Sequence, residues 1–275
     1  MTQQKRTLDL LAEVKLIIRE YDSRLTVRQL YYQLVTRQFI ENNINEYKRL
    51  DAHLARFRKN RDLPLDTFDD RIRKPIGESS WENLNDFFET VKNAYRKNKR
   101  TNQKKYVEVW IEKDALSGIF EPITNYYNCL LLVGRGYQSI SSLSEAAKRF
   151  SINNGYSSEE KKETVILYFG DYDATGIDIP RSAEQNLNKY FGIYPTFEKI
   201  GLLKENIEKY KLPSVPSKKT DSRSAAFILK CGNVAVELDA LPPRVLERKI
   251  RESIVKHLDL KQFEKDKEIE EEEIK

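Results

Sequence analysis

The stretch "LYFGDYDATGIDIP", residues 167–180, places Asp171 and Asp173 directly after an apolar run and directly before a turn. An aspartate in this position can cap the following helix, whose N-terminus favours negative charge. Two neighbouring carboxylates can also surround a divalent cation. For either aspartate alone the helix cap is the simpler interpretation, so the choice depends on which other residues lie at the same place.

The chain around this stretch alternates between β-rich and helical segments from residue 106 onward. Five apolar runs have strand character, and helical spacing separates them: 106–111, 129–134, 164–170, 194–200 and 233–241. Such alternation predicts an α/β fold, a mostly parallel sheet with helices on both faces. In such sheets a ligand binds outside the carboxyl ends of the strands.

Three carboxylates are expected at that edge. Glu112 ends the first predicted strand, and Asp171 and Asp173 follow the third. A few carboxylates on a rigid frame are what Mg²⁺ requires, whereas without a cation they would repel one another. The three together therefore favour a metal site over a helix cap. Arg135, in the "GRG" turn 134–136 after another strand, is a candidate for binding a phosphate at the same edge.

The first 63 residues predict three amphipathic helices, and the third is rich in Arg and Lys. Thr26 is a plausible N-cap for the second helix. Three short helices with a basic third one suit a helix-turn-helix or winged-helix module.

The second helix contains two adjacent tyrosines that its periodicity separates. At about 100° per residue Tyr31 falls within the apolar stripe, whereas Tyr32 points about 130° away from its centre. Tyr31 is therefore expected to be a core residue. Tyr32 is expected to be exposed, with Arg28 one turn earlier on the same side. By periodicity alone Tyr32 is an ordinary surface tyrosine.

Composition excludes several classes of protein. Of 275 residues 39% are hydrophobic and 33% charged, and no apolar run approaches the roughly 18 residues of a membrane span. The N-terminus lacks the apolar core of a signal peptide, and Cys129 and Cys231 do not suggest disulfides. His53 and His257 are isolated, which disfavours a zinc site or a histidine-based triad. We expect a cytoplasmic protein that does not bind membranes.

The net charge of +5 is unevenly distributed. The run "VKNAYRKNKRTNQKK", residues 91–105, has seven basic residues and no acidic one. It is either a solvated helix face and linker or a segment that contacts nucleic-acid phosphates. The acidic end of the chain predicts a frayed, solvated helix. No GxxxxGK[ST] loop is present, so ATP or GTP hydrolysis is not supported.

Three motifs occur in order on the predicted strands: "IEKDAL" (111–116), "VGRGYQS" (133–139) and "GDYDATGIDI" (170–179). They resemble a Toprim domain, in the version found in the DNA topoisomerase VI A subunit and related meiotic double-strand-break transesterases. Ala174 departs from the proline usual in that family. The segment "VRQLYYQLV" (27–35) is similar to the winged-helix segment that carries the family's nucleophilic tyrosine.

The resemblance implies four regions: a winged-helix-like DNA-binding domain (1–75), a basic helical linker (76–105), a Toprim domain (106–255) and a charged tail (256–275). It implies tyrosine-linked, Mg²⁺-dependent double-strand breaks in DNA. Tyr32 would be the nucleophile, Arg28 and Arg135 would stabilise charge, and Mg²⁺ would be held by Glu112, Asp171 and Asp173. Residues expected to bind the flanking duplex through phosphates are Arg49, Arg56, Arg58, Lys59 and Arg61.

In that family the tyrosine and the metal site come from different subunits, so a homodimer is implied. A separate ATPase B-type subunit would be needed for strand passage, and the location would be the nucleoid. Two alternatives remain open: a Toprim endonuclease that uses activated water, and a non-catalytic DNA-binding module. Glu237 and Asp239 are expected on one face of a late strand, either near the metal edge or facing solvent, and are left out of the metal set.

Overall fold

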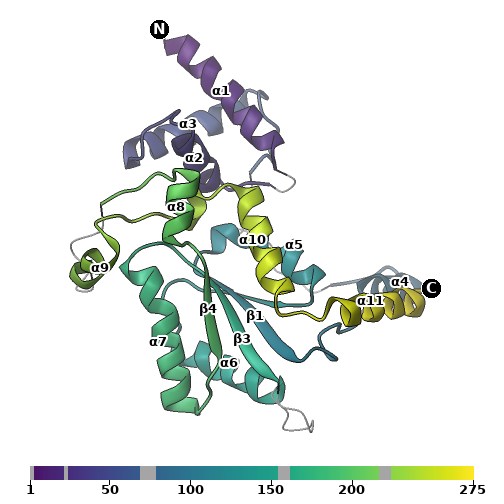
Figure 1. The fold of residues 1–275 in the computed structure, drawn as a ribbon. Coiled ribbons are helices and arrows are strands. Elements are labelled where there is room, and N and C mark those ends of the chain that lie inside the picture. The colour runs from purple at the N-terminus through teal and green to yellow at the C-terminus, as the bar shows by residue number, and fades with distance from the viewer. Residues whose placement is uncertain (1–2, 22–23, 69–78, 154–161, 217–223) are drawn as a thin grey trace.

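The structure, a computed structural model, describes residues 3–21, 24–68, 79–153, 162–216 and 224–275 (Figure 1). It is an α/β fold in which helices surround one four-stranded, all-parallel sheet. The described chain begins with the helices α1 (Gln3–Arg19), α2 (Val27–Thr36) and α3 (Ile44–Lys59). The exposed helix α4 (Leu84–Ala94) follows them.

The first three helices share a core of their own. Leu10, Val14 and Ile17 of α1 pack with Leu30 and Leu34 of α2, and α3 adds its apolar side to the same cluster. A capping box starts α2: the Thr26 side chain accepts a hydrogen bond from the Gln29 amide at 3.2 Å, and the Gln29 side chain accepts one from the Thr26 amide at 2.7 Å. The predicted cap at Thr26 is thus confirmed. A parallel bridge also joins Leu25 to Phe68.

The sheet has the strand order β2-β1-β3-β4. Its strands are β1 (Lys105–Ile111), β2 (Leu130–Val133), β3 (Glu163–Phe169) and β4 (Thr196–Gly201). Ile111 at the end of β1 is in register with Val133 of β2 and with Phe169 of β3. The residues that follow β1, β2 and β3 therefore meet at one edge, as the sequence predicts.

Helices cover both faces of the sheet, as expected. Val107, Val109 and Ile111 of β1 point into a layer formed with α5 (Ser117–Tyr126) and α10 (Pro243–Val255). Trp110 points into the opposite layer, formed with α6 (Ile140–Asn153) and α7 (Ala174–Phe191). Alternate strand residues are buried on opposite sides, which explains why β1 and β3 read as nearly continuous apolar runs.

The predicted fifth strand at 233–241 is wrong. Helices α8 (Lys204–Tyr210) and α9 (Ser224–Cys231) precede this segment. Its strand pairing with the described residues consists of isolated antiparallel bridges, Val236 with Tyr172 and Ala235 with Val215. It then forms the short 3₁₀ helix η2 (Leu238–Ala240). Its apolar residues are buried because the segment crosses the end of the sheet and packs into the α5–α10 layer. Burial, and not strand pairing, causes the alternating pattern.

The C-terminal helix α11 (Leu260–Ile274) is not a frayed, solvated tail, which corrects that expectation. Phe263 is buried in the core, and acidic side chains of α11 pair with the basic segment that follows α4. Lys99 Nζ lies 2.5 Å from Glu270 Oε2, and Lys97 Nζ lies 3.1 Å from Glu273 Oε1. Part of the basic run 91–105 is thus neutralised within the chain. No described helix is both long enough and apolar enough to span a membrane.

A buried ion pair between β1 and α6 gives a test of this fold. Glu108 is fully buried, and its carboxylate accepts hydrogen bonds from Arg149 at 2.8 and 3.1 Å, as well as from Tyr106 and Trp110. Arg149→Ala leaves the carboxylate without its counter-charge and should lower the free energy of unfolding by about 3 kcal/mol in chemical denaturation. Lys148→Ala, at an exposed neighbouring pair, should cost less than about 1 kcal/mol. Equal effects of the two changes would contradict the assignment.

Candidate functional site

The N-terminal helices contact the edge of the sheet where the strand ends meet. Helix α2 packs against η2 and against the short 3₁₀ helix η1 (Asp114–Leu116), which directly follows the end of β1. In Figure 1 the unit formed by α1–α3 lies on the side of the sheet unit that carries α8 and α10. This contact brings Arg28 and Tyr32 of α2 to the predicted carboxylate edge.

A network of alternating charges occupies this contact. Lys113, the residue after Glu112, places its Nζ 2.8 Å from Asp171 Oδ2 and 2.5 Å from Glu237 Oε2. Arg28 Nη2 lies 2.8 Å from the same Glu237 oxygen. Asp239 Oδ2 lies farther from both cations, 3.5 Å from Arg28 Nε and 3.9 Å from Lys113 Nζ. Arg28 and Lys113 thus both pair with Glu237. The more deeply buried Asp171 and Asp239 also contact these cations.

Tyr32 lies inside this network, and the expectation that it is exposed is wrong. Only 8% of the residue is accessible. Its hydroxyl accepts a hydrogen bond from Arg28 Nη2 at 3.5 Å, and Arg28 in turn pairs with Glu237. Burial, followed by the charge of Glu237, raises the pKa of Tyr32 well above its usual value. The hydroxyl is therefore protonated at neutral pH.

Tyr31 is a core residue, as predicted. It is 4% exposed, and its hydroxyl hydrogen-bonds to the carbonyl oxygens of Glu41 and Asn43 at 3.3 and 3.1 Å. Periodicity placed Tyr31 correctly because its surroundings come from the same helical unit. Tyr32 is covered by the segment around η2, which lies about 200 residues later in the chain.

The three predicted metal ligands follow β1 and β3 as expected, and each already has protein partners. Glu112 Oε2 accepts hydrogen bonds from the Asp171 amide at 3.1 Å and the Tyr168 hydroxyl at 3.3 Å. Asp173 caps α7 by accepting a hydrogen bond from the Gly176 amide at 2.7 Å. The helix-cap interpretation is therefore confirmed for Asp173. As the side chains lie, no three His, Cys, Asp or Glu residues in the described ranges are placed to hold one ion.

Burial and neighbouring charges shift the pKa values of several side chains at this edge of the sheet. Burial, and then the charge of Asp171, raises the pKa of Glu112. Burial raises the pKa of Asp239 to about 6, and no hydrogen-bond donor reaches either of its carboxylate oxygens among the described residues. Burial also lowers the pKa of Lys199 to about 8, although Glu112, Asp173 and Asp171 act against this shift. Burial is thus the first cause of all three shifts, and the neighbouring carboxylates add to the shift of Glu112 and oppose that of Lys199.

Arg135 follows β2 at the predicted edge but does not join the network. Its side chain is 81% exposed, and its closest acidic partner among the described residues is Asp114 at 4.0 Å. It reaches a phosphate only if the phosphate lies at the outer rim of the site.

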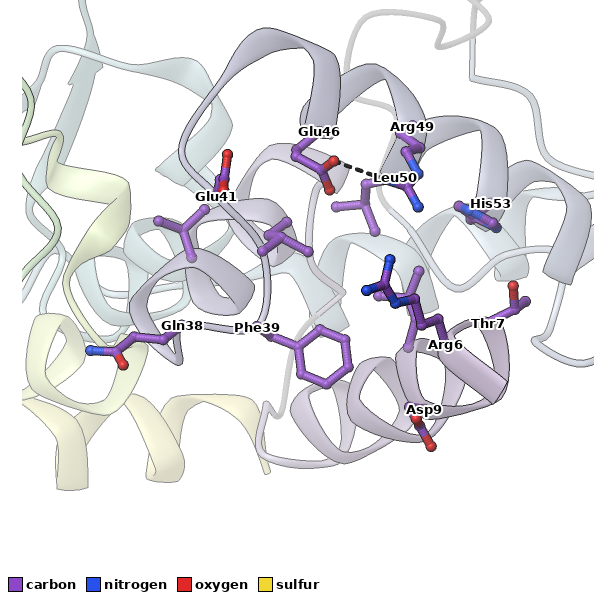
Figure 2. Close-up of a pocket in the computed structure, with 13 residues that line it drawn as sticks. Arg6, Thr7, Asp9, Gln38, Phe39, Glu41, Glu46, Arg49, Leu50 and His53 are labelled. Carbon is purple, nitrogen blue, oxygen red and sulfur yellow. Dashed lines mark hydrogen bonds and ion pairs between the residues drawn. The ribbon is translucent and has the colours of Figure 1, made fainter. Parts of the chain in front are cut away.

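The predicted DNA-binding residues lie on α3 or directly after it. Arg49 pairs with Glu46 at 2.9 Å, and Arg58 lies over the ring of Phe68. Arg56 contacts the ring of His53, while Lys59 and Arg61 are exposed. Arg49 also lines a cavity of about 860 Å³ between α1 and α3, together with Arg6 and Phe39 (Figure 2). This cavity is separate from the charged network, because its described lining includes neither Tyr32 nor the network carboxylates Asp171, Glu237 and Asp239.

Three residues central to the network were not in the predicted site: Lys113, Glu237 and Asp239. The interpretation of Glu237 and Asp239 as a solvent-facing pair is wrong, because Asp239 is buried and Glu237 bridges Lys113 and Arg28. A signal for all three was present. Lys113 stands inside the "IEKDAL" motif, and the two acids alternate in an apolar segment.

The pKa of Asp239 predicts how stability depends on pH. Because its folded pKa of about 6 is higher than the unfolded value near 3.9, the folded state binds more protons between these values, and stability falls as pH rises through them. Asp239→Asn removes this cost. It should raise the free energy of unfolding at pH 7.5 by about 3 kcal/mol and have little effect at pH 4. A constant difference across this range, in denaturation at several pH values, would contradict the prediction.

Comparison with known proteins adds no constraint on this site. No protein-family model matches the chain, and no curated protein matches it either. A function must therefore be inferred from the residues that the fold brings together.

Proposed function

We propose that this chain cleaves DNA in the manner of a topoisomerase VI A subunit, with a winged-helix-like unit that supplies Tyr32 and a Toprim-like unit that supplies the carboxylates. One observation carries the proposal. Arg28 and Tyr32, from the N-terminal helices, lie against the carboxyl edge of a parallel sheet and within reach of Lys113, next to Glu112. A tyrosine, two cations and the acidic motifs thus meet at one place.

Mg²⁺ is the proposed cofactor, held by Glu112, Asp171 and Asp173. All three side chains offer hard oxygen ligands. Burial and then the charge of Asp171 raise the pKa of Glu112, and a bound cation would lower it again. When bound, the ion would neutralise charge on a scissile phosphate and position it. Asp171 is paired with Lys113 as the side chains lie, so the ligands must rearrange to take the ion.

Residues of the chain would perform the remaining chemistry. In the proposed step the Tyr32 oxygen forms a bond to phosphorus, the bond from phosphorus to the 3′ oxygen breaks, and that oxygen leaves as a hydroxyl after taking a proton. Arg28 and Lys113 both lower the pKa of Tyr32, although less than burial raises it, so they favour the tyrosinate that attacks. The tyrosine proton passes to water when the site opens to substrate.

One observation favours the alternative of a nuclease that uses water. Tyr32 is 8% exposed and its hydroxyl accepts a hydrogen bond from Arg28, so it does not face solvent as a free nucleophile would. In that case the tyrosine would be structural, and a water molecule would attack the phosphate. The two proposals differ in whether a covalent protein–DNA link forms.

Trapping of that link separates the two mechanisms. Wild-type protein with labelled duplex DNA and Mg²⁺ should give a denaturant-stable adduct, and Tyr32→Phe should reduce the adduct to background because it removes the attacking oxygen. Tyr31→Phe is the matched control, one residue away and also buried, and it should retain the adduct.

Unchanged cleavage by Tyr32→Phe would establish water as the nucleophile. If Glu112→Ala cleaves and also binds Mg²⁺ in calorimetry as the wild type does, the metal assignment fails. Absence of cleavage under all conditions would favour a DNA-binding module.

The resemblance implies a homodimer in which the tyrosine of one subunit meets the metal site of the other. Here Tyr32 lies against the carboxylate edge of its own chain, so the homodimer is proposed on a separate ground, the exposed apolar side of α4. Leu84, Phe88 and Val91 share one side of this helix by their spacing, and all three are exposed. The first half of α4 carries Asp86 and Glu89, whereas Lys92 lies near its end. Two copies of α4 packed antiparallel would cover the apolar side and place unlike charges together, which is the self-complementarity that a two-fold interface requires.

A charge placed in the centre of this surface should separate the subunits. Phe88→Asp should convert a dimer into a monomer in light scattering at micromolar concentration, because the aspartate would be buried in the interface. Asn93→Asp adds the same charge on another side of the helix and should leave the dimer intact. Dimers of equal stability in both variants would rule out α4 as the interface.

A further inference from the structure

The carboxylate of Glu237 has the partners that a phosphate group would have. Arg28 Nη2 lies 2.8 Å from Oε2, Lys113 Nζ lies 2.5 Å from the same oxygen, and the Tyr32 hydroxyl lies 3.5 Å from Arg28 Nη2. An arginine fork and a lysine ammonium are the side chains that proteins use to bind phosphate oxygens. In this structure the carboxylate of Glu237, an anion of the chain itself, occupies the site formed by Arg28 and Lys113.

We propose that Arg28, Lys113 and the Tyr32 hydroxyl form a binding site for a phosphodiester, and that Glu237 fills it until substrate phosphate displaces the Glu237 side chain. The identification of DNA as the source of the phosphate rests on the proposed function. The anion site itself does not, since it is defined by the three groups around Glu237.

The surrounding residues would keep the two cations in place after Glu237 moves. Asp171 Oδ2 lies 2.8 Å from Lys113 Nζ, and Asp239 Oδ2 lies 3.5 Å from Arg28 Nε, and neither contact involves Glu237. Both of these carboxylates are buried, whereas the Glu237 side chain is 33% exposed and that of Arg28 is 48% exposed. The deep carboxylates thus anchor the cations, and the outer one is accessible to exchange.

The exchange requires only a side-chain rotation. The backbone before Glu237 is fixed by the bridges of Ala235 with Val215 and of Val236 with Tyr172. The backbone after it is fixed by the Leu238 amide, which donates to Asp171 Oδ1 at 2.8 Å. Because both neighbours are held, the carboxylate can leave the cations without a change in the fold.

Because Glu237 competes for the two cations, the site favours anions that make additional contacts elsewhere on the protein. A free phosphate must compete with a carboxylate that is already tethered beside the cations, so its binding is weakened. A phosphate within a DNA duplex gains further contacts from the basic residues of α3, which offset the competition. Glu237 therefore opposes occupation of the site by small anions.

The test measures binding of inorganic phosphate in EDTA, by calorimetry and by the shift of the unfolding midpoint. Glu237→Gln removes the competing charge but keeps the size of the side chain, and it should bind phosphate about tenfold more tightly than the wild type. Glu205→Gln, at an exposed acid on α8, is the matched control and should bind phosphate as the wild type does. In the double variant Arg28→Gln/Glu237→Gln the gain should disappear.

Two results would overturn the proposal: no gain in a folded Glu237→Gln protein, or a gain that survives the loss of Arg28. If Glu237→Gln fails to fold, Glu237→Ala takes its place, because it also removes the competing carboxylate and a gain in phosphate binding is again expected.

The binding readout also separates this inference from the proposed function. Tighter phosphate binding without any DNA cleavage would retain the anion site and reject the cleavage mechanism. Cleavage that depends on Tyr32, with no gain in Glu237→Gln, would reject the anion site alone.

Discussion

The arrangement of the site depends on the ion pairs of Lys113. This residue follows the end of β1, and its ammonium group pairs with Asp171 after β3 and with Glu237 beside η2. Lys113 thus joins three segments that lie far apart in the sequence. Burial alone would lower the pKa of Lys113, but Asp171, Asp239 and Glu237 together raise it, and the lysine is charged at neutral pH. Without it, buried carboxylates would repel one another across the edge of the sheet.

Arg28 extends this network into the N-terminal helices. It shares Glu237 with Lys113, so the contact between the two units is electrostatic as well as apolar. Burial would raise the pKa of Glu237, but Lys113 and Arg28 outweigh it and lower the value to about 2. The bridge therefore persists across neutral pH. It also holds the segment around η2 against α2, where this segment covers Tyr32.

The sequence predicts those parts of the molecule that depend on local periodicity. The four parallel strands, and the meeting of Glu112 with Asp171 at one edge, follow from apolar runs and from the geometry of parallel sheets. The exposure of Tyr32 was mispredicted because helical spacing describes only the helix itself and not what covers it. The segment 233–241 was mispredicted because burial at a chain crossing produces the same alternation as a strand. Long-range contacts decided both cases.

The charge balance of the site connects the proposed metal with the proposed phosphate. The group comprises five carboxylates, Glu112, Asp171, Asp173, Glu237 and Asp239, and three cations, Arg28, Lys113 and Lys199. A phosphodiester that displaces Glu237 adds a negative charge while the carboxylate remains nearby. Such an excess can be reduced by protonating Asp239, whose pKa is about 6, or by binding a divalent cation.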